Sequence, residues 1–159
     1  MGRKSVRENK NIYQEAREAL GLTREAAAEL LEFISDDRIE KIESEKSFPR
    51  PDEVLHMSEC YKKPELCNWF CTHECPIGKK YVPEASVKDL SQIMLEMLAT
   101  LNSLEKEKER LIEITVDGEI SEDEKEDFES IREQLAYMSK AISSLTLWAD
   151  NAANNGKIK

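Results

Sequence analysis

The sequence has little glycine and few aromatic residues. Five of its 159 residues are glycine, five are proline, and aromatic residues make up 6% of the chain. A glycine-rich nucleotide-binding α/β enzyme and a β-sandwich both need more glycine at their tight turns, so this shortage argues against them. The charged fraction of 35% instead favours solvated helices. We therefore expect an all-α fold.

Long apolar runs are also missing. No stretch approaches the roughly 18 to 20 uninterrupted apolar residues that span a membrane, and the basic segment 1–10 leads into no apolar signal core. Cysteine is absent outside positions 60–75, where all four cysteines of the chain lie. These absences predict a cytoplasmic protein without a membrane partner, with reduced thiols or a metal site rather than a disulfide framework.

Charge is unevenly distributed along the chain. Residues 1–83 carry 14 basic and 16 acidic side chains, a net charge of -2, and residues 84–159 carry 9 and 17, a net charge of -8. Pro83 cannot continue a helix and disfavours helical geometry at Val82, so we place a domain boundary here, between residues 1–83 and 84–159. A negative field repels phosphates, and any nucleic-acid contact should therefore come from residues 1–83.

Two apolar patterns with alternating spacings of three and four residues run through the C-terminal half. Their members are Leu90, Met94, Met97, Leu101, Leu104, Lys108 and Leu111 in the first, and Phe128, Ile131, Leu135, Met138, Ile142, Leu145, Ala149 and Ala152 in the second. Ser86 with Asp89, and Ser121 with Glu124, have the spacing of capping boxes. The patterns predict a long antiparallel αα-hairpin with arms of about 40 Å.

Such a hairpin buries only part of its apolar surface by itself. Two hairpins packed together form a four-helix bundle, a common route to a symmetric dimer. We therefore expect a homodimer through residues 84–159. The alternative is that the stripe packs on the N-terminal domain of the same chain.

The N-terminal half divides into short helices, expected at residues 11–20, 24–31, 36–44 and 52–61. Thr23 and Ser35 suit the N-caps of the second and third helices, and Gly21 suits a left-handed cap that ends the first. A tight break is expected at residues 32–34. This stretch resembles the phage-repressor-type, or XRE-type, helix-turn-helix family in Gly21-Leu22-Thr23, the small Ala28, the Ile42-Glu43 dipeptide and an apolar fourth helix after a proline.

The resemblance implies a lambda-repressor-like helix-turn-helix bundle whose third helix enters the major groove of double-stranded DNA, usually as a dimer. It also implies a set of DNA-binding residues: Arg24, Ser35, Asp36, Asp37, Arg38 and Lys41. Arg38 could donate two hydrogen bonds to a guanine edge, and an aspartate could accept one from cytosine. Arg3, Lys4, Arg7 and Lys10 could add a basic arm.

Two features favour a different use of the same fold. The turn at residues 32–35 is one residue longer than is usual in the family, and the third helix region holds five acidic residues against three basic ones. Because the neutralisation of phosphates by basic residues dominates affinity for DNA, such an acidic helix attracts DNA only weakly. The alternative to a DNA-binding transcriptional regulator is therefore a protein-interaction module with a helix-turn-helix fold.

The cysteine cluster follows Pro64, which suits a helix start. Cys67 and Cys71 then lie on one helical face and Cys75 follows the helix, with His73, His56 or Cys60 available as a fourth metal ligand. Zinc favours such a sulfur and nitrogen set, and an iron-sulfur cluster could use the same ligands. The alternatives are inert apolar packing beside Trp69 and Phe70, or a local disulfide. No acid-base constellation is visible in the sequence, and we expect no enzymatic activity.

Overall fold

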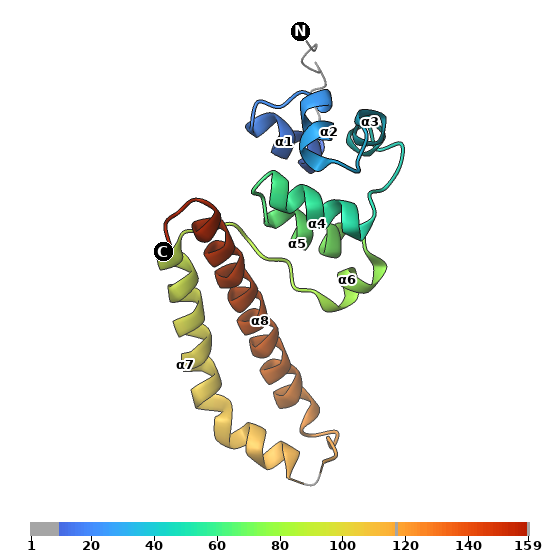
Figure 1. Cartoon of the computed structure of the whole chain (residues 1–159). Coiled ribbons are helices and arrows are strands. Elements are labelled where there is room, and N and C mark those ends of the chain that lie inside the picture. Colours follow the sequence, from blue (N-terminus) through green and yellow to red (C-terminus); the bar gives the residue numbers. More distant parts are fainter. Residues whose placement is uncertain (1–9, 117, 159) are drawn as a thin grey trace. The chain divides into compact units, whose positions relative to one another are not determined.

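The computed structural model describes residues 10–116 and 118–158. These residues form helices without any strand: α1 Ile12–Ala19, α2 Arg24–Leu31, α3 Asp36–Glu43, α4 Pro51–Cys60, α5 Glu65–His73, α6 Pro76–Tyr81, α7 Leu90–Thr115 and α8 Lys125–Asn154 (Figure 1). The chain divides into two compact units, Met1–Val82 and Pro83–Lys159. The prediction of an all-helical chain with a long C-terminal helix pair is confirmed. None of the described helices is both long and apolar enough to cross a membrane.

Side-chain caps fix the first three helix starts of the N-terminal unit. Asn11, Thr23 and Ser35 each accept a hydrogen bond from the backbone N–H three residues later, which satisfies one of the free donors of the first helical turn. Gly21 has a φ of +69° after α1, a conformation that glycine adopts without strain. The predicted caps at Thr23 and Ser35 are confirmed.

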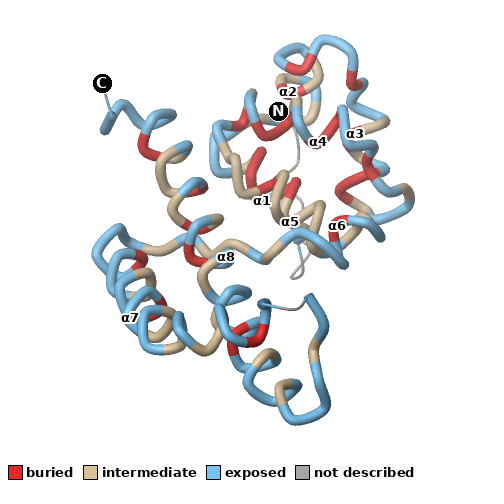
Figure 2. Tube along the Cα trace, turned by 90° about the horizontal axis from the view of Figure 1, so that it is seen from below, coloured by how far each residue is buried: buried red, intermediate tan, exposed pale blue. Residues whose placement is uncertain are grey.

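The core of the N-terminal unit is built by α1 to α5, where the buried positions gather (Figure 2). Its buried apolar residues are Tyr13, Ala16, Ala27, Leu31, Ile34, Ile39, Ile42, Val54, Met57, Tyr61 and Leu66. Ile39 and Ile42, three residues apart on α3, point inward together with Val54 and Met57 of α4. The opposite side of α3 therefore faces solvent, which positions the candidate site described below.

The C-terminal unit is the helix pair α7 and α8, which lie side by side along their length (Figure 1). At about 1.5 Å per residue, their 26 and 30 residues span roughly 39 and 45 Å. α7 begins later than a cap at Ser86 would place it, because Asp89 is its N-cap and accepts from the backbone N–H of Gln92. The backbone N–H of Ser86 instead donates to Ser144 Oγ of α8, at 3.0 Å.

The contact between α7 and α8 follows the predicted apolar stripes only in part. The buried residues of α7 are Ile93, Thr100 and Ile114, whereas Leu90, Met94 and Leu101 of the predicted stripe remain 37 to 50% exposed. On α7 the buried Ile93 and Thr100 each lie one position before a stripe residue. On α8 the stripe residues Ile131 and Ala152 are buried, together with Ala141, Ser144 and Leu147 outside the stripe. The larger apolar residues are left on an adjacent face of the pair.

Candidate interaction site on helices α2 and α3

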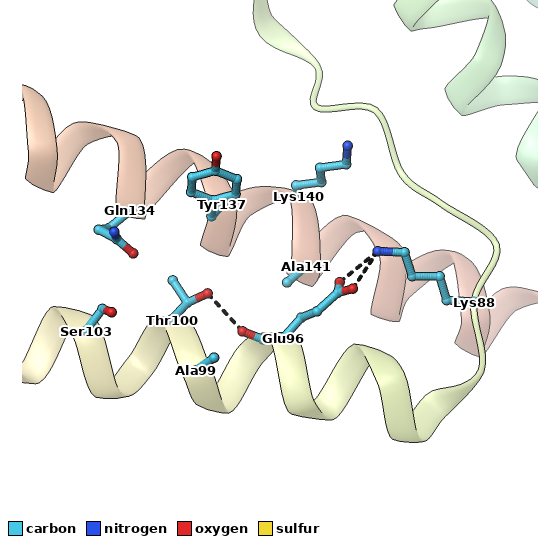
Figure 3. Close-up of a pocket in the computed structure, with 9 residues that line it drawn as sticks. All are labelled: Lys88, Glu96, Ala99, Thr100, Ser103, Gln134, Tyr137, Lys140 and Ala141. Carbon is cyan, nitrogen blue, oxygen red and sulfur yellow. Dashed lines mark hydrogen bonds and ion pairs between the residues drawn. The ribbon is translucent and has the colours of Figure 1, made fainter.

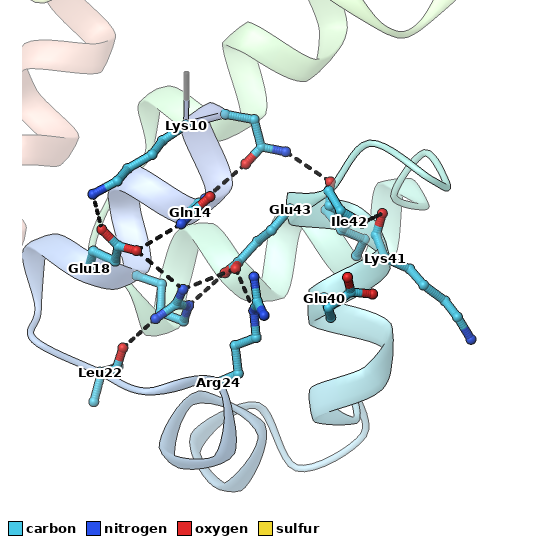
Figure 4. A network of polar contacts seen from close by, with 12 residues as sticks. Lys10, Gln14, Glu18, Leu22, Arg24, Glu40, Lys41, Ile42 and Glu43 are labelled. Carbon is cyan, nitrogen blue, oxygen red and sulfur yellow. Dashed lines mark hydrogen bonds and ion pairs between the residues drawn. The ribbon is translucent and has the colours of Figure 1, made fainter. Parts of the chain in front are cut away.

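A buried carboxylate lies at the centre of the N-terminal unit. The Glu43 side chain is 1% exposed and binds two arginines, Arg17 of α1 and Arg24 of α2. Figure 4 shows Glu43 and Arg24 pointing toward one another. Arg17 donates from Nε to Oε1 at 2.6 Å and from Nη2 to Oε2 at 3.0 Å, and Arg24 donates from Nε to Oε2 at 2.8 Å. Arg24 therefore links α2 to α3, and its Nε is occupied by a carboxylate of its own chain.

Arg38 forms a second internal ion pair. Its Nε and Nη2 donate to the two carboxylate oxygens of Glu53 at 2.9 and 2.7 Å. Nη1 donates to Ser47 Oγ, and Nη2 also donates to the backbone oxygen of Phe48. The hydrogen bonds and charge of Arg38 lower the pKa of Glu53 below its ordinary value. Arg38 thus ties α3 to the following loop and to α4, and in this conformation its guanidinium is not free to read a base edge.

The other predicted DNA-binding residues lie on the solvent side of α3. Ser35 caps the helix, and Asp36, Asp37 and Lys41 are exposed. Lys41 Nζ pairs with Asp37 at 2.6 Å one helical turn away. The structure therefore keeps Ser35, Asp36, Asp37 and Lys41 together on one surface and directs Arg38 away from it. Arg3, Lys4 and Arg7 of the predicted basic arm lie outside the described residues, and Lys10 pairs with Glu18.

Acidic side chains dominate the exposed surface of α2 and the first turn of α3. Glu25 and Glu29 are four residues apart, which places them on one face of α2, and Glu32 directly follows the helix; all three are exposed. We call these three residues, together with Asp36 and Asp37, the acidic face. The regular spacing was visible in the sequence, but the sequence prediction considered only α3.

An exposed aromatic residue adjoins the acidic face. Glu32 has a φ of +56° after the last turn of α2, and the chain reverses so that Ile34 is buried while Phe33 is 72% exposed. The Phe33 ring stacks on His56 of α4 with a centroid distance of 4.4 Å. Leu30, which is 44% exposed, precedes this turn. Exposed aromatic and aliphatic side chains bordered by charge are typical of protein-binding surfaces.

The four cysteines of the predicted metal cluster are free thiols of intermediate exposure, and each described sulfur contact has a different partner. Cys67 donates to Ser58 Oγ of α4 at 3.2 Å, and Cys75 Sγ accepts from the backbone N–H of Gly78 at 3.4 Å, which caps α6. The ring of His73 stacks on Trp69. Within residues 10–116 and 118–158, no group of three or more candidate ligands is arranged to hold a metal ion.

Burial also disfavours the free thiolate of two of the cysteines, the form in which a cysteine acts as a nucleophile. It raises the pKa of Cys71, to which the neighbouring Cys75 and Cys67 add, and it raises the pKa of Cys60. The set Cys67, Cys71, Cys75 and His73, with zinc or an iron-sulfur cluster, remains a prediction. The observed contacts favour the alternative in which the cysteines pack and cap helices.

The helix that follows the cysteines, α6, was not predicted, and it approaches α5 closely at Gly78. A Cβ atom at this position would lie 2.1 Å from the backbone oxygen of Cys71, closer than any real contact.

We expect Gly78→Ala to lower the free energy of unfolding of the N-terminal unit by about 1–3 kcal/mol, as overpacking does. Denaturant titration followed by Trp69 fluorescence in a Trp148→Phe background measures this. Ile77→Ala, at an adjacent side chain that is 72% exposed, should change stability by less than about 0.5 kcal/mol.

Comparison of the chain with protein-family models, with curated proteins and with solved structures finds no match. The residues of the acidic face and their surroundings are therefore the basis for a functional proposal.

Proposed function

We propose that the N-terminal unit is a non-enzymatic helix-turn-helix module that binds a basic segment of another protein through the acidic face. Opposite charges on two surfaces speed their encounter and fix their relative orientation. Phe33, beside the acidic face, provides an apolar anchor of the kind that contributes most to binding energy. A cytoplasmic location, as expected from the sequence, belongs to the same proposal.

One observation carries this proposal: the arginines predicted to contact DNA are bound to carboxylates of their own chain. Arg24 and Arg38 pair with Glu43 and Glu53, whose side chains are 1% and 6% exposed. On the surface that remains, Lys41 is the one exposed base between Thr23 and Glu43, and it already pairs with Asp37. Such a surface attracts cations and repels phosphates.

A DNA-binding transcriptional regulator is the second candidate. It is favoured by the exposed outer side of α3, where Asp36 and Asp37 in the first turn and Lys41 in the last could reach base edges while Ser35 lies near a phosphate. The exposed Lys46 and Arg50, which follow α3, could add phosphate contacts.

Charge substitutions on α3 should act in opposite directions on the two kinds of partner. If the acidic face binds a basic protein, Asp36→Asn combined with Asp37→Asn weakens binding of a lysine- and arginine-rich peptide on the order of tenfold, because two favourable charge interactions are lost. Lys41→Met should leave that binding unchanged or strengthen it slightly. Fluorescence anisotropy with the labelled peptide measures both effects on the full-length chain.

The same variants titrated with a labelled DNA duplex test the second candidate. On a duplex of arbitrary sequence, a DNA-binding protein should bind more tightly after Asp36→Asn and Asp37→Asn, because less negative charge repels the phosphates. Lys41→Met should weaken binding and reduce its salt dependence by about one phosphate contact. That pattern, with no measurable affinity for the peptide, would overturn the protein-binding proposal in favour of a regulator.

A further inference from the structure

The helix pair α7 and α8 has one large apolar surface that its own seam does not use. Six large apolar residues of the two helices are 37 to 51% exposed, and they belong to or border the stripes identified in the sequence: Leu90, Met94, Leu98, Leu101, Leu135 and Ile142. We call these six residues the outer apolar face. Isolated exposed apolar side chains are ordinary, but a contiguous row along two helices is not.

Helical geometry places these residues on the same side of the pair. On α7, Met94 and Leu101 directly follow the seam residues Ile93 and Thr100, and on α8, Ile142 directly follows the buried Ala141. Each step along a helix turns the side chain by about 100° in one sense. Because α7 and α8 run antiparallel, the same sense of rotation on both helices leads to the same side.

The residues that precede the seam positions lie on the opposite side and are mostly polar. Ala99 and Lys140, which precede Thr100 and Ala141, line a groove of about 440 Å³ together with Glu96, Ser103, Gln134 and Tyr137 (Figure 3). Lys88 Nζ binds both carboxylate oxygens of Glu96 at 2.7 and 2.8 Å in this groove. The pair thus has a polar side with a groove and an apolar side whose large side chains are 37 to 51% exposed.

The charge and the exposed area of the outer apolar face both indicate what kind of partner covers it. Residues 84–159 contain 9 basic and 17 acidic side chains, yet only Lys108 among the fifteen positions of the two stripes is charged. A basic partner would need acidic residues on this face, and the stripes contain none. Six side chains that are each about half exposed leave on the order of 500 Å² of apolar surface. With the half-buried residues beside them, this approaches the roughly 800 Å² per partner of a standard interface.

We propose that a second copy of the chain covers the outer apolar face, so that two hairpins form a four-helix bundle about a two-fold axis. An isologous interface requires one self-complementary surface, and an uncharged apolar face on both helices meets that requirement without pairing like charges. The spacing of three and four residues in the stripes is the one that packed helices of such bundles use. The polar groove remains on the outside of this dimer.

Sedimentation equilibrium of the full-length chain tests the proposal. The wild type should have twice the monomer mass of 18.3 kDa at micromolar concentrations. Leu101→Asp, which places two unpaired carboxylates in a symmetric interface, should weaken dimerisation by 100-fold or more in order of magnitude. Ile142→Asp should do the same from α8. Far-ultraviolet circular dichroism establishes that each variant remains helical, and Leu101→Ala provides a milder change if the aspartate variant loses helix.

Tyr137→Asp is the matched control, because Tyr137 is 65% exposed on α8 but lies on the groove side. It should leave the dimer intact. Raising the salt concentration should strengthen the wild-type dimer or leave it unchanged, since it screens the repulsion between two acidic chains. Any of three results would overturn the proposal. The wild type could be monomeric at high concentration, Tyr137→Asp could dissociate the dimer while Leu101→Asp does not, or high salt could dissociate the dimer. These readouts are independent of what the acidic face binds.

Discussion

Arg17→Met is expected to lower the free energy of unfolding of the N-terminal unit by about 3 kcal/mol or more. The substitution leaves Glu43, whose side chain is 1% exposed, with only the single contact to Arg24 Nε. A buried carboxylate that loses its main partner keeps the cost of its removal from water, which is why breaking a buried pair costs about 3–5 kcal/mol. Urea titration of the Trp148→Phe protein, followed by the fluorescence of Trp69, measures this loss.

Lys41→Met is the control for Arg17→Met. Its ion pair with Asp37 is exposed, with both side chains at least 48% accessible, so we expect a change of less than about 0.5 kcal/mol. Similar effects for the two substitutions would mean that Arg17 does not stabilise Glu43 as a buried carboxylate. This result would also contradict the role of Arg24 inferred from the same ion-pair network.

Arg38→Met should destabilise the N-terminal unit by a comparable amount, about 3 kcal/mol, because Glu53 is only 6% exposed and loses both of its guanidinium hydrogen bonds. Adding Glu53→Met should restore much of the lost stability, since the double variant buries no unpaired charge. A double variant less stable than Arg38→Met would contradict this account. If instead Arg38→Met left stability unchanged and removed DNA binding, Arg38 would be a base-reading residue.

The same pair gives the N-terminal unit a defined pH dependence. The hydrogen bonds from Arg38 lower the pKa of Glu53 below its ordinary value of 4.5, so the folded state binds this proton more weakly than the unfolded chain does. The stabilisation that ionised Glu53 gives to the folded state is therefore present above pH 4.5 and is lost as the pH falls below this value. Arg38→Met should lose less stability than the wild type across this acidic range, which urea titrations at several pH values would measure.

Local sequence patterns located the helices with good accuracy. The helix Arg24–Leu31 has the bounds expected from its pattern, α3 differs from expectation by one residue at its C-terminal end, and α4 differs by one residue at each end. This accuracy has a local cause: Thr23 and Ser35 supply N-cap oxygens to donors three residues away, and Gly21 adopts a positive φ after α1. Such interactions depend on neighbours in the chain, which the sequence displays directly.

The roles of individual charged residues could not be predicted in the same way. Arg38 has the position and chemistry of a base reader, but its guanidinium reaches Glu53, which is fifteen residues further along the chain. Arg24 is likewise bound to Glu43, nineteen residues away. No periodicity of one helix encodes these pairs, because each joins residues of two different helices. The helix α6 was missed for a related reason, since its cap is a cysteine and its close packing on α5 requires Gly78.

The sequence by itself determined that this chain is helical, where most of its helices begin, and that its C-terminal half carries two long apolar stripes. Each of these properties follows from interactions within one or two helical turns. Only the tertiary structure decided which charges remain available on α2 and α3 and which stripe residues the seam between α7 and α8 uses. Side chains such as Arg38 and Thr100 acquire their roles from partners on other helices, and the relative rotation of packed helices is set by the whole contact between them.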